Sequence, residues 1–386
     1  MRILFISHYA LPHLGGVEIV VDQLARELLR HGCTVTHVAA ASLRPGESLT
    51  EEPPYRVIRL PALNPLESTL AVPYPLFEPV QLWRTIARES RTADVVHAHG
   101  MLYAGSLLGL EYAKRRRRDA VRVLTEHAGR VGYRSSLLNG AEKVAIGTIG
   151  RKTAGAAETI VVVGQRIQQE MRTLSPATPV ECIENGVDLS LFRPATDRER
   201  AHIRGELGWD ERPRVLFVGR MVEKKGARVV LETARLSNRF RFVIVGPRGD
   251  QVPAGLADSF DGSTLPRTSL ADIYRAADAF LLPSHGEGGF PLTAREAMAC
   301  GLPVILGEDP AYGEIAARAA EGIRLVPART PEIVEAIDDL LAAGAVAREA
   351  VARFAASSFL WSHAAERHLE LYERLRAGRG RTGDHG

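Results

Sequence analysis

The strongest constraint on the fold of this chain is a series of short apolar runs that recur along its whole length. Val, Ile, Leu and Phe dominate the runs, and a segment long enough for a helix follows most of them. Runs that are apolar on both faces are typical of parallel strands in a sheet that helices cover on both sides. The runs are Arg2 to Ser7, Thr34 to Ala39, Arg56 to Leu60, Val95 to Ala98, Arg122 to Thr125, Thr159 to Val163, Glu181 to Glu184, Arg214 to Val218, Arg241 to Val245, Ala279 to Leu282, Pro303 to Leu306 and Gly322 to Val326.

The segments between the runs have the pattern of amphipathic helices. In Val17 to Arg30, apolar residues recur three and four positions apart, which places them on one helical face. Strands that alternate with helices predict a doubly wound α/β fold. At roughly 100 to 200 residues per domain, the 386 residues are enough for two such domains.

The pattern changes near Arg193-Pro194, where a strand-rich block ends and a charged helix begins. We therefore expect a linker at about Leu189 to Asp197. The predicted organisation is one α/β domain over residues 1–190, a second over residues 191–358, and a last segment over residues 359–386. Phe359 to Arg376 in that segment is predicted to be an amphipathic helix, and the tail after it to fray. The expected apolar stripe of this helix is Trp361, Ala365, Leu369 and Tyr372.

Composition excludes several classes of protein. The 45% hydrophobic and 25% charged residues are those of a soluble globular chain, and the net charge of +3 is too small for a protein that coats nucleic acid. The three cysteines form no Cys-x-x-Cys pair, which argues against a zinc or redox clip and favours a reducing compartment. No run approaches the roughly 18 apolar residues that a membrane-spanning helix needs. The predicted location is the cytoplasm, with no nucleic-acid partner.

In the first half, Gly15-Gly16 stands directly before a helix, after the first strand. Glycine lets the backbone approach a ligand, and the N–H groups of a helix N-terminus attract an anion. An ordinary turn explains the same pair equally well. Neither half contains a Gly-x-Gly-x-x-Gly motif, which argues against a dinucleotide-dependent oxidoreductase.

Three histidines follow the strands at one edge of the predicted first sheet, His97 and His99 in one run and His127 after the next. We expect His97 to lie in the packing of the sheet and His127 to point into a cleft. A metal site is conceivable here, but no carboxylate pattern completes it, so we predict none.

In the second half, the segment FVGRMVEKKG places Arg220 and Lys225 after a strand, with Gly226 before the next helix. Two cations beside a helix N-terminus can neutralise a diphosphate. A solvated charged loop is the alternative explanation of these residues.

The segment PSHGEGGFPLTAREAMACGLPVI contains a glycine-rich loop and a helix that we expect to begin near Pro291. Backbone N–H groups exposed at such a helix start suit an anion or sugar hydroxyls. Glu287 lies in the loop and Glu296 on the helix, and carboxylates accept the paired hydroxyls of a ribose or hexose well. Alternatively, Glu296 is a buried helix residue without a ligand.

Together these segments resemble glycosyltransferase family 4, the retaining nucleotide-sugar glycosyltransferases of the GT-B fold. The similarity covers nearly the whole chain, and GRMVEKKG and PSHGEGGFPLTAREAMACGLPVI are its most specific parts. It implies two Rossmann-like doubly wound domains that face across a cleft, the N-terminal one binding the acceptor and the C-terminal one the donor. The terminal helix would cross back to the N-terminal domain.

The resemblance also implies roles for individual residues. Arg220 and Lys225 would hold the donor diphosphate, Glu296 the ribose hydroxyls, and His127 the transferred sugar, beside the Gly15-Gly16 loop. Backbone N–H groups that would hold sugar and phosphate oxygens belong to Gly289, Phe290, Leu292 and Thr293. The paired glutamates of the family have seven residues between them, whereas Glu287 and Glu296 have eight, so the position of family spacing is Gly288. This difference puts the sugar-contacting role of Glu287 in question.

The implied reaction is transfer of a sugar from a UDP- or GDP-sugar to an acceptor hydroxyl with retention of anomeric configuration. The leaving phosphate would take the acceptor proton, and neither a metal nor a cofactor is required. The alternatives are a catalytically silent GT-B subunit and a GT-B sugar-nucleotide epimerase. The segments expected to shape the acceptor site, Leu63 to Pro79 and Arg130 to Asn139, do not identify the acceptor, be it a sugar, a lipid or a small molecule.

The run Lys114 to Arg118 is the densest cluster of positive charge. Such a run attracts anionic lipid head groups, at about 1 kcal/mol per cation near a charged surface. We favour a solvated helix end that complements the helix dipole, and peripheral membrane contact is the alternative.

Overall fold

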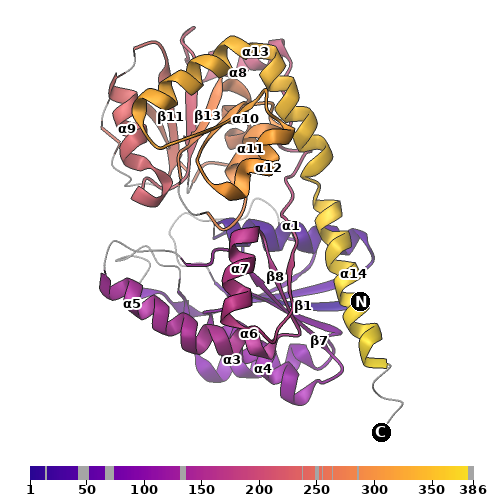
Figure 1. Cartoon of the computed structure of the whole chain (residues 1–386). Coiled ribbons are helices and arrows are strands. Elements are labelled where there is room, and N and C mark those ends of the chain that lie inside the picture. The colour runs from indigo at the N-terminus through magenta and orange to yellow at the C-terminus, as the bar shows by residue number, and fades with distance from the viewer. Residues whose placement is uncertain are drawn as a thin grey trace. The chain divides into compact units, whose positions relative to one another are not determined.

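The computed structural model of the chain describes residues 1–13, 15–41, 52–65, 74–130, 136–236, 238–247, 252–253, 255–262, 264–284 and 287–380. Internal contacts divide the chain into two compact units. The N-terminal unit comprises Met1–Asn185 together with Trp361–Gly386, and the C-terminal unit comprises Gly186–Leu360. The last helix therefore belongs to the same unit as the first strand, as Figure 1 shows.

The N-terminal unit is built on a seven-stranded sheet with the strand order β3-β2-β1-β6-β7-β8-β9. Every neighbouring pair in it is parallel. The strands are β1 (Arg2–Tyr9), β2 (Thr34–Ala40), β3 (Arg56–Leu60), β6 (Val95–His99), β7 (Val121–Glu126), β8 (Thr159–Val162) and β9 (Val180–Cys182). A separate antiparallel pair consists of β4 (Ala62–Leu63) and β5 (Leu76–Phe77).

Helices connect and cover these strands. They are α1 (Gly16–Arg30), α3 (Pro79–Ser90), α4 (Ala104–Arg116), α5 (Ser136–Ala145), the π-helical turn η1 (Ile146–Gly150), α6 (Arg151–Ala156), α7 (Gln165–Leu174) and α14 (Trp361–Gly380). The core between sheet and helices is apolar and contains Leu4, Ile6, Val96, Leu124 and Ile160, all at most 2% exposed. Burial of this kind is the main favourable term in folding.

The C-terminal unit repeats the architecture with a six-stranded parallel sheet in the order β12-β11-β10-β13-β14-β15. Its strands are β10 (Arg214–Val218), β11 (Arg241–Gly246), β12 (Ala257–Asp261), β13 (Ala279–Leu282), β14 (Val304–Gly307) and β15 (Ile323–Val326). Its helices are α8 (Asp197–Glu206), α9 (Ala227–Leu236), α10 (Arg267–Ala276), α11 (Leu292–Ala299), α12 (Gly313–Arg318) and α13 (Thr330–Ser358), with the 3-10 turns η2 (Glu223–Lys225) and η3 (Pro310–Tyr312).

The predicted fold class is confirmed, because each of the twelve apolar runs forms a strand of one of two parallel sheets. Strand β12, whose residues Ala257–Asp261 are ADSFD, was not among the predicted strands. This strand lies at the edge of its sheet and is only partly buried. An edge strand with a solvated face has no continuous apolar run, so it gives none of the signal on which the other strands were found.

The predicted helix from Phe359 to Arg376 begins two residues later than expected and extends further, as α14. Phe359 and Leu360 separate it from α13, and the N–H of Val187 donates to the carbonyl of Phe359 at 2.9 Å. The predicted stripe also needs correction, because Leu369 is half-buried and His368 is 5% exposed in its place. The end of the tail, residues 381–386, lies outside the described residues.

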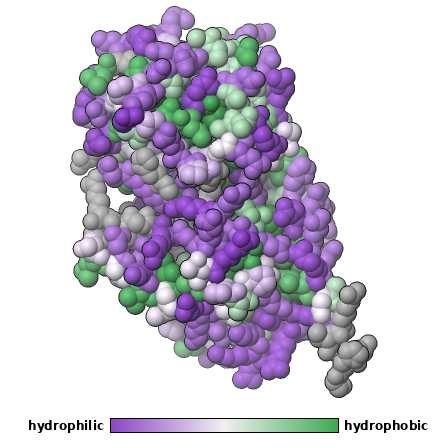
Figure 2. Space-filling view, viewed as in Figure 1, coloured by the Kyte–Doolittle hydropathy of each residue, from purple (hydrophilic) through white to green (hydrophobic). Residues whose placement is uncertain are grey.

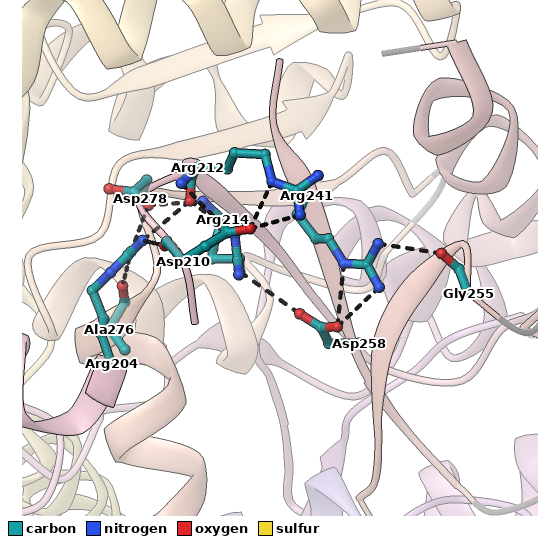
Figure 3. A network of polar contacts seen from close by, with 9 residues as sticks. All are labelled: Arg204, Asp210, Arg212, Arg214, Arg241, Gly255, Asp258, Ala276 and Asp278. Atoms are coloured by element: carbon teal, nitrogen blue, oxygen red, sulfur yellow. Dashed lines mark hydrogen bonds and ion pairs between the residues drawn. The ribbon is translucent and has the colours of Figure 1, made fainter. Parts of the chain in front are cut away.

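Charged residues tie together the strand starts of the C-terminal sheet (Figure 3). Asp278, directly before β13, accepts the backbone N–H of Arg214 at 2.8 Å and Nη1 of Arg204 at 3.0 Å. Arg214, which opens β10, and Arg241, which opens β11, lie 3.7 Å and 3.2 Å from the carboxylate of Asp258. This network lies at the edge opposite to the carboxyl ends of the strands, where ligands bind in such sheets.

The surface is polar, as the 25% of charged residues leads one to expect. The face drawn in Figure 2 is mainly hydrophilic, with apolar residues in small patches. None of the described helices is long and apolar enough to cross a membrane.

Candidate active site

At the carboxyl edge of the N-terminal sheet, the neighbouring strands β1, β6 and β7 end side by side. They place His8, His99 and Glu126 near the ends of the three strands, and His127 directly follows β7. The sequence predicted His127 at this edge. It did not single out His8 or Glu126.

The predicted loop residues Gly15 and Gly16 are the N-cap and the first residue of α1. A Cβ atom at Gly15 would lie 2.4 Å from Oε2 of Glu18, so the turn brings the backbone against this carboxylate. Glu18 is 2% exposed, and its Oε1 lies 2.8 Å from Nδ1 of His13 and 3.4 Å from Nε2 of His8. Burial opposes its ionisation, but the two histidines outweigh this and lower the pKa of Glu18.

This group of two histidines and one glutamate was not predicted from sequence. Its only sequence signal was an acidic residue in the first turn of the helix after Gly15-Gly16, which is common at helix starts.

His127 forms a pair with His99. Nε2 of His127 lies 3.1 Å from Nδ1 of His99, and the two rings are stacked with centroids 5.3 Å apart. Burial lowers the pKa of His127 to about 3 and that of His99 well below its ordinary value, so both rings are neutral near pH 7.

His97 lies in the packing of the sheet, as expected. It is fully buried, its Nδ1 is 2.6 Å from the hydroxyl of Tyr372 on α14, and its Nε2 is 2.6 Å from the hydroxyl of Thr125. Both ring nitrogens therefore have partners within the unit, which leaves none for a ligand.

Glu126 holds two loops of this edge together. Its carboxylate accepts the backbone N–H of Met101 at 2.9 Å and that of Ala128 at 3.2 Å. Burial raises the pKa of Glu126, although these hydrogen bonds act in the opposite direction. The carboxylate thus fixes the segment that carries His127 against the loop after β6.

In the C-terminal unit, glycines allow the loops at the carboxyl edge to approach one another closely. Gly226, with φ at +77°, leaves no room for a Cβ, which would lie 2.7 Å from the carbonyl oxygen of Pro283. At Gly307 a Cβ would lie 2.4 Å from the carbonyl oxygen of Ser284. The loops after β10 and β13 and the end of β14 therefore meet there.

This close approach brings together two of the predicted residues. Nζ of Lys225 lies 2.7 Å from Oε1 of Glu287, and both side chains are partly exposed, at 29% and 15%. Arg220 lies just beyond β10, with its side chain exposed. The structure thus places all three at the carboxyl edge of one sheet, and the extra residue in the glutamate spacing does not keep Glu287 from Lys225.

Helix α11 begins at Leu292, next to the predicted start near Pro291 and two residues after the loop residue Phe290. Its N-cap is Pro291, whose side chain supplies no hydrogen bond, so the N–H groups of Leu292 and Thr293 have no partner within the helix. Arg295, 1% exposed, donates from Nε to the carbonyl of Phe290 at 3.3 Å. This contact fixes the loop that precedes the helix.

Glu296 on the same helix is 5% exposed and already has two protein partners. Nη2 of Arg267 donates to its Oε1 at 2.8 Å, and the hydroxyl of Tyr274 to its Oε2 at 3.2 Å. Burial and the charge of Glu296 raise the pKa of Tyr274 well above its ordinary value, so the phenol remains a donor. Each carboxylate oxygen retains a lone pair that can accept a further hydroxyl.

Other predicted features lie elsewhere or only partly within the described residues. The run Lys114 to Arg118 ends α4, where Lys114 donates to the carbonyl of Gly155 and Arg117 to that of Ser90. Of the two expected acceptor segments, residues 66–73 and 131–135 are outside the described ranges. Within those ranges, no group of three or more His, Cys, Asp or Glu side chains is arranged to hold a metal.

Comparison with sequence families and curated proteins gives consistent matches. Residues 14–191 match the family described as Glycosyltransferase Family 4, and residues 212–343 match Glycosyl transferases group 1. The D-inositol 3-phosphate glycosyltransferase of Mycolicibacterium vanbaalenii is 29% identical over 396 residues, covering 93% of this chain and 85% of that protein.

Solved structures share the fold over almost the whole chain. The sucrose-phosphate synthase of Thermosynechococcus elongatus has a TM-score of 0.75 and 22% identity, covering 98% of this chain and 99% of that one. HepE of Anabaena, solved in complex with UDP-glucose, has a TM-score of 0.74 and 18% identity, covering 97% of this chain and 100% of that one.

Proposed function

This chain belongs to glycosyltransferase family 4 and has the GT-B fold, and on that premise we propose that its donor is a UDP-sugar held by the C-terminal unit. As a member of the family it is a retaining glycosyltransferase that uses a nucleotide-sugar donor. The complexes of HepE with UDP and with UDP-glucose make UDP-sugars the first donors to test. GDP-sugars are the alternative.

The observation that carries the proposal is the meeting of Lys225, Glu287 and the start of α11 at the carboxyl edge of the C-terminal sheet. Lys225 binds the donor diphosphate together with Arg220. An ammonium group has three donors, so Lys225 can keep Glu287 and still bind a phosphate oxygen. The N–H groups of Gly289, Phe290, Leu292 and Thr293 add donors for sugar and phosphate oxygens.

Glu296 accepts the ribose hydroxyls. Arg267 and Tyr274 hold its carboxylate in one orientation. Its oxygens are therefore positioned to accept hydrogen bonds from the two hydroxyls of a diol. In the N-terminal unit, His127 contacts the transferred sugar, and the Gly15-Gly16 loop borders the diphosphate and the acceptor.

The reaction breaks the bond from the anomeric carbon to the diphosphate oxygen and forms one to the acceptor oxygen on the same face. The departing phosphate oxygen takes the proton of the acceptor hydroxyl. Arg220, Lys225 and the helix N-terminus stabilise the negative charge that grows on the leaving group, a term often worth several kcal/mol. Glu287 orients Lys225 and contacts the sugar.

Because relatives carry the names D-inositol 3-phosphate glycosyltransferase and sucrose-phosphate synthase, phosphorylated polyols and sugars are the first acceptors to test. We place the reaction in the cytoplasm. Peripheral membrane contact through Lys114 to Arg118 is the weaker alternative, because Lys114 and Arg117 already bind backbone carbonyls of the protein.

The proposal predicts that Lys225→Ala and Arg220→Ala each lower sugar transfer by on the order of a hundredfold or more while the fold is kept. Donors are first found by thermal shift with UDP, GDP and their sugars, since a ligand of the folded state raises apparent stability. Transfer rates are then measured with the donor that binds.

The matched control is Lys224→Ala, the neighbouring lysine in the same turn, which should transfer at close to the normal rate. Near-normal transfer in Lys225→Ala or Arg220→Ala would contradict the assigned roles.

A further inference from the structure

A row of histidines, buried except for the half-buried His127 at its end, runs through the N-terminal unit from its carboxyl edge to α14. His127 pairs with His99, the ring of His99 stacks on that of His97 with centroids 4.4 Å apart, and His97 binds the hydroxyl of Tyr372. The assigned reaction uses only His127. The other rings therefore require a separate explanation.

Each of the two rings has one nitrogen in the contact between His127 and His99 and a second nitrogen outside it. Within the described residues, Nδ1 of His127 and Nε2 of His99 are buried and have no hydrogen-bond partner. His99 is fully enclosed, whereas His127 stands at the strand end and is half-buried. Nδ1 of His127 is itself buried, but its ring lies at the strand end and is partly exposed, so of the two unpaired nitrogens it is the nearer to a ligand at this edge.

A neutral imidazole carries one proton, so the pair has two arrangements. In the first, Nε2–H of His127 donates to His99, and Nε2–H of His99 remains buried without an acceptor. In the second, Nδ1–H of His99 donates to His127, and the remaining N–H group is on Nδ1 of His127. An orphaned buried N–H costs the full desolvation of that group. This cost is lower in the second arrangement even without a ligand, because the N–H then belongs to the half-buried His127 at the strand end, nearer to water, and not to the fully enclosed His99.

We propose that His99 is a positioning residue that donates its Nδ1–H to Nε2 of His127 and so fixes the ring and the tautomer of His127, whose Nδ1–H then faces the ligand. The group this donor recognises is an oxygen with a free lone pair, a hydroxyl of the donor sugar. The substrate contact rests on the proposed function, whereas the tautomer and its cause do not.

His99 can act in this way because its own ring is held firmly. Phe5 packs edge-on against it with centroids 5.1 Å apart, and His97 lies against one face. His97 in turn is fixed by the hydroxyls of Thr125 and Tyr372. A ring locked on several sides cannot turn to bind His127 through another atom, which is what positioning a neighbouring group requires.

The decisive experiment measures ring ¹⁵N chemical shifts of histidine-labelled protein without any ligand, since these shifts distinguish a protonated from an unprotonated ring nitrogen. We expect the wild-type His127 to show a single tautomer with the proton on Nδ1. His99→Phe keeps an aromatic ring between Phe5 and His97 but removes the donor, and should give a mixture of both tautomers at His127. His99→Asn, whose side-chain amide can donate in place of Nδ1–H, should restore the single tautomer.

The matched control is His37→Asn, which removes another buried histidine of the same sheet that binds Ser7 rather than His127. It should leave the His127 signals unchanged. A wild-type His127 with its proton on Nε2, or a single unchanged tautomer in His99→Phe, would refute the proposal. If His99→Phe fails to fold, the wild-type spectrum and His99→Asn still decide it.

Kinetics connect the tautomer to the substrate. With the donor found active, UDP-glucose being the first probe, His99→Phe should lower kcat/KM on the order of a hundredfold and leave the affinity for UDP alone unchanged. A general structural defect would weaken both. A wild-type protein that transfers from no donor would refute the proposed function, whereas the ligand-free spectra would still test His99.

Discussion

Glu126 shows how much one side chain can contribute to the site without touching a substrate. Its two carboxylate oxygens accept backbone N–H groups from two loops, the one after β6 and the one that carries His127. We predict that Glu126→Gln destabilises the protein by about 1 to 3 kcal/mol, because the new amide places a donor against a buried N–H. Transfer should fall as well, because the loop that carries His127 is released.

Urea denaturation and transfer assays at pH 7 test this prediction. The matched control is Glu170→Gln, the same exchange at a carboxylate that accepts the N–H of Arg130 at 3.3 Å but is 30% exposed. Its effect on stability should be well under 1 kcal/mol, since water can replace the lost contact. Equal effects of the two exchanges would show that burial of Glu126 does not matter.

Among single residues, those in motifs with a chemical role could be predicted from sequence. The residues that hold them in place could not. Lys225 and Glu287 were predicted at one site from two separate motifs, and the structure places them 2.7 Å apart. Glu18, with its histidine partners, has no comparable signal, because its partners come from a strand end and a loop that only the fold brings together. Such contacts are set by tertiary structure, which spacing along the chain does not reveal.

Among the elements, the starts of the C-terminal strands depend on one carboxylate. Asp278 receives the N–H of Arg214 and the guanidinium groups of Arg200 at 2.5 Å and Arg204 at 3.0 Å. We predict that Asp278→Ala costs roughly 2 to 4 kcal/mol, somewhat below the loss for a fully buried pair because the aspartate is 21% exposed. The loss should loosen β10, β13 and α8 together.

Hydrogen exchange and urea denaturation measure this effect. The matched control is Asp272→Ala on α10, a carboxylate that is 44% exposed and whose ion pair among the described residues is with Arg275 of its own helix. Surface pairs of this kind contribute at most about 1 kcal/mol. If Asp272→Ala were as damaging as Asp278→Ala, the network would not be what holds the strand starts.

Among helices and strands, burial decides which elements could be predicted from sequence. Buried strands gave clear apolar runs, whereas the partly exposed β12 gave none. The start of α14 was predicted two residues too early, because Phe359 and Leu360 are apolar and continue a helical pattern. What interrupts the helix is the pairing of these residues with Val187, a contact distant in sequence.

For the whole molecule, the two units differ in their titratable interiors. The N-terminal unit buries His8, His13, His37, His97, His99 and His368, and it half-buries His127, the neutral partner of His99. In the C-terminal unit the one described histidine is His202, whose side chain is 73% exposed. We therefore expect the two units to respond differently to acid, although both have the same fold.

We predict that acid unfolds the N-terminal unit first. Burial lowers the pKa of His37 and His127 to about 3 and that of His368 to about 4. Between these values and the ordinary pKa of about 6.5, the unfolded chain binds more protons, so stability falls as the pH is lowered through this window. Each such histidine contributes a slope of up to about 1.4 kcal/mol per pH unit.

Glu126 changes the stability in the opposite direction. Its raised pKa lets the folded state bind a proton before the unfolded chain does, so this group adds stability as the pH falls, but it is one group against several histidines.

Trp209 reports on the C-terminal unit and Trp361 on α14, so single-tryptophan variants separate the two transitions by fluorescence. Between pH 7 and pH 5 the urea midpoint of the Trp361 signal should fall clearly more than that of Trp209. Replacing His368 by Leu should reduce the pH slope of the first transition only. Parallel shifts of both signals with pH would show instead that the buried histidines are not the groups that make this protein sensitive to acid.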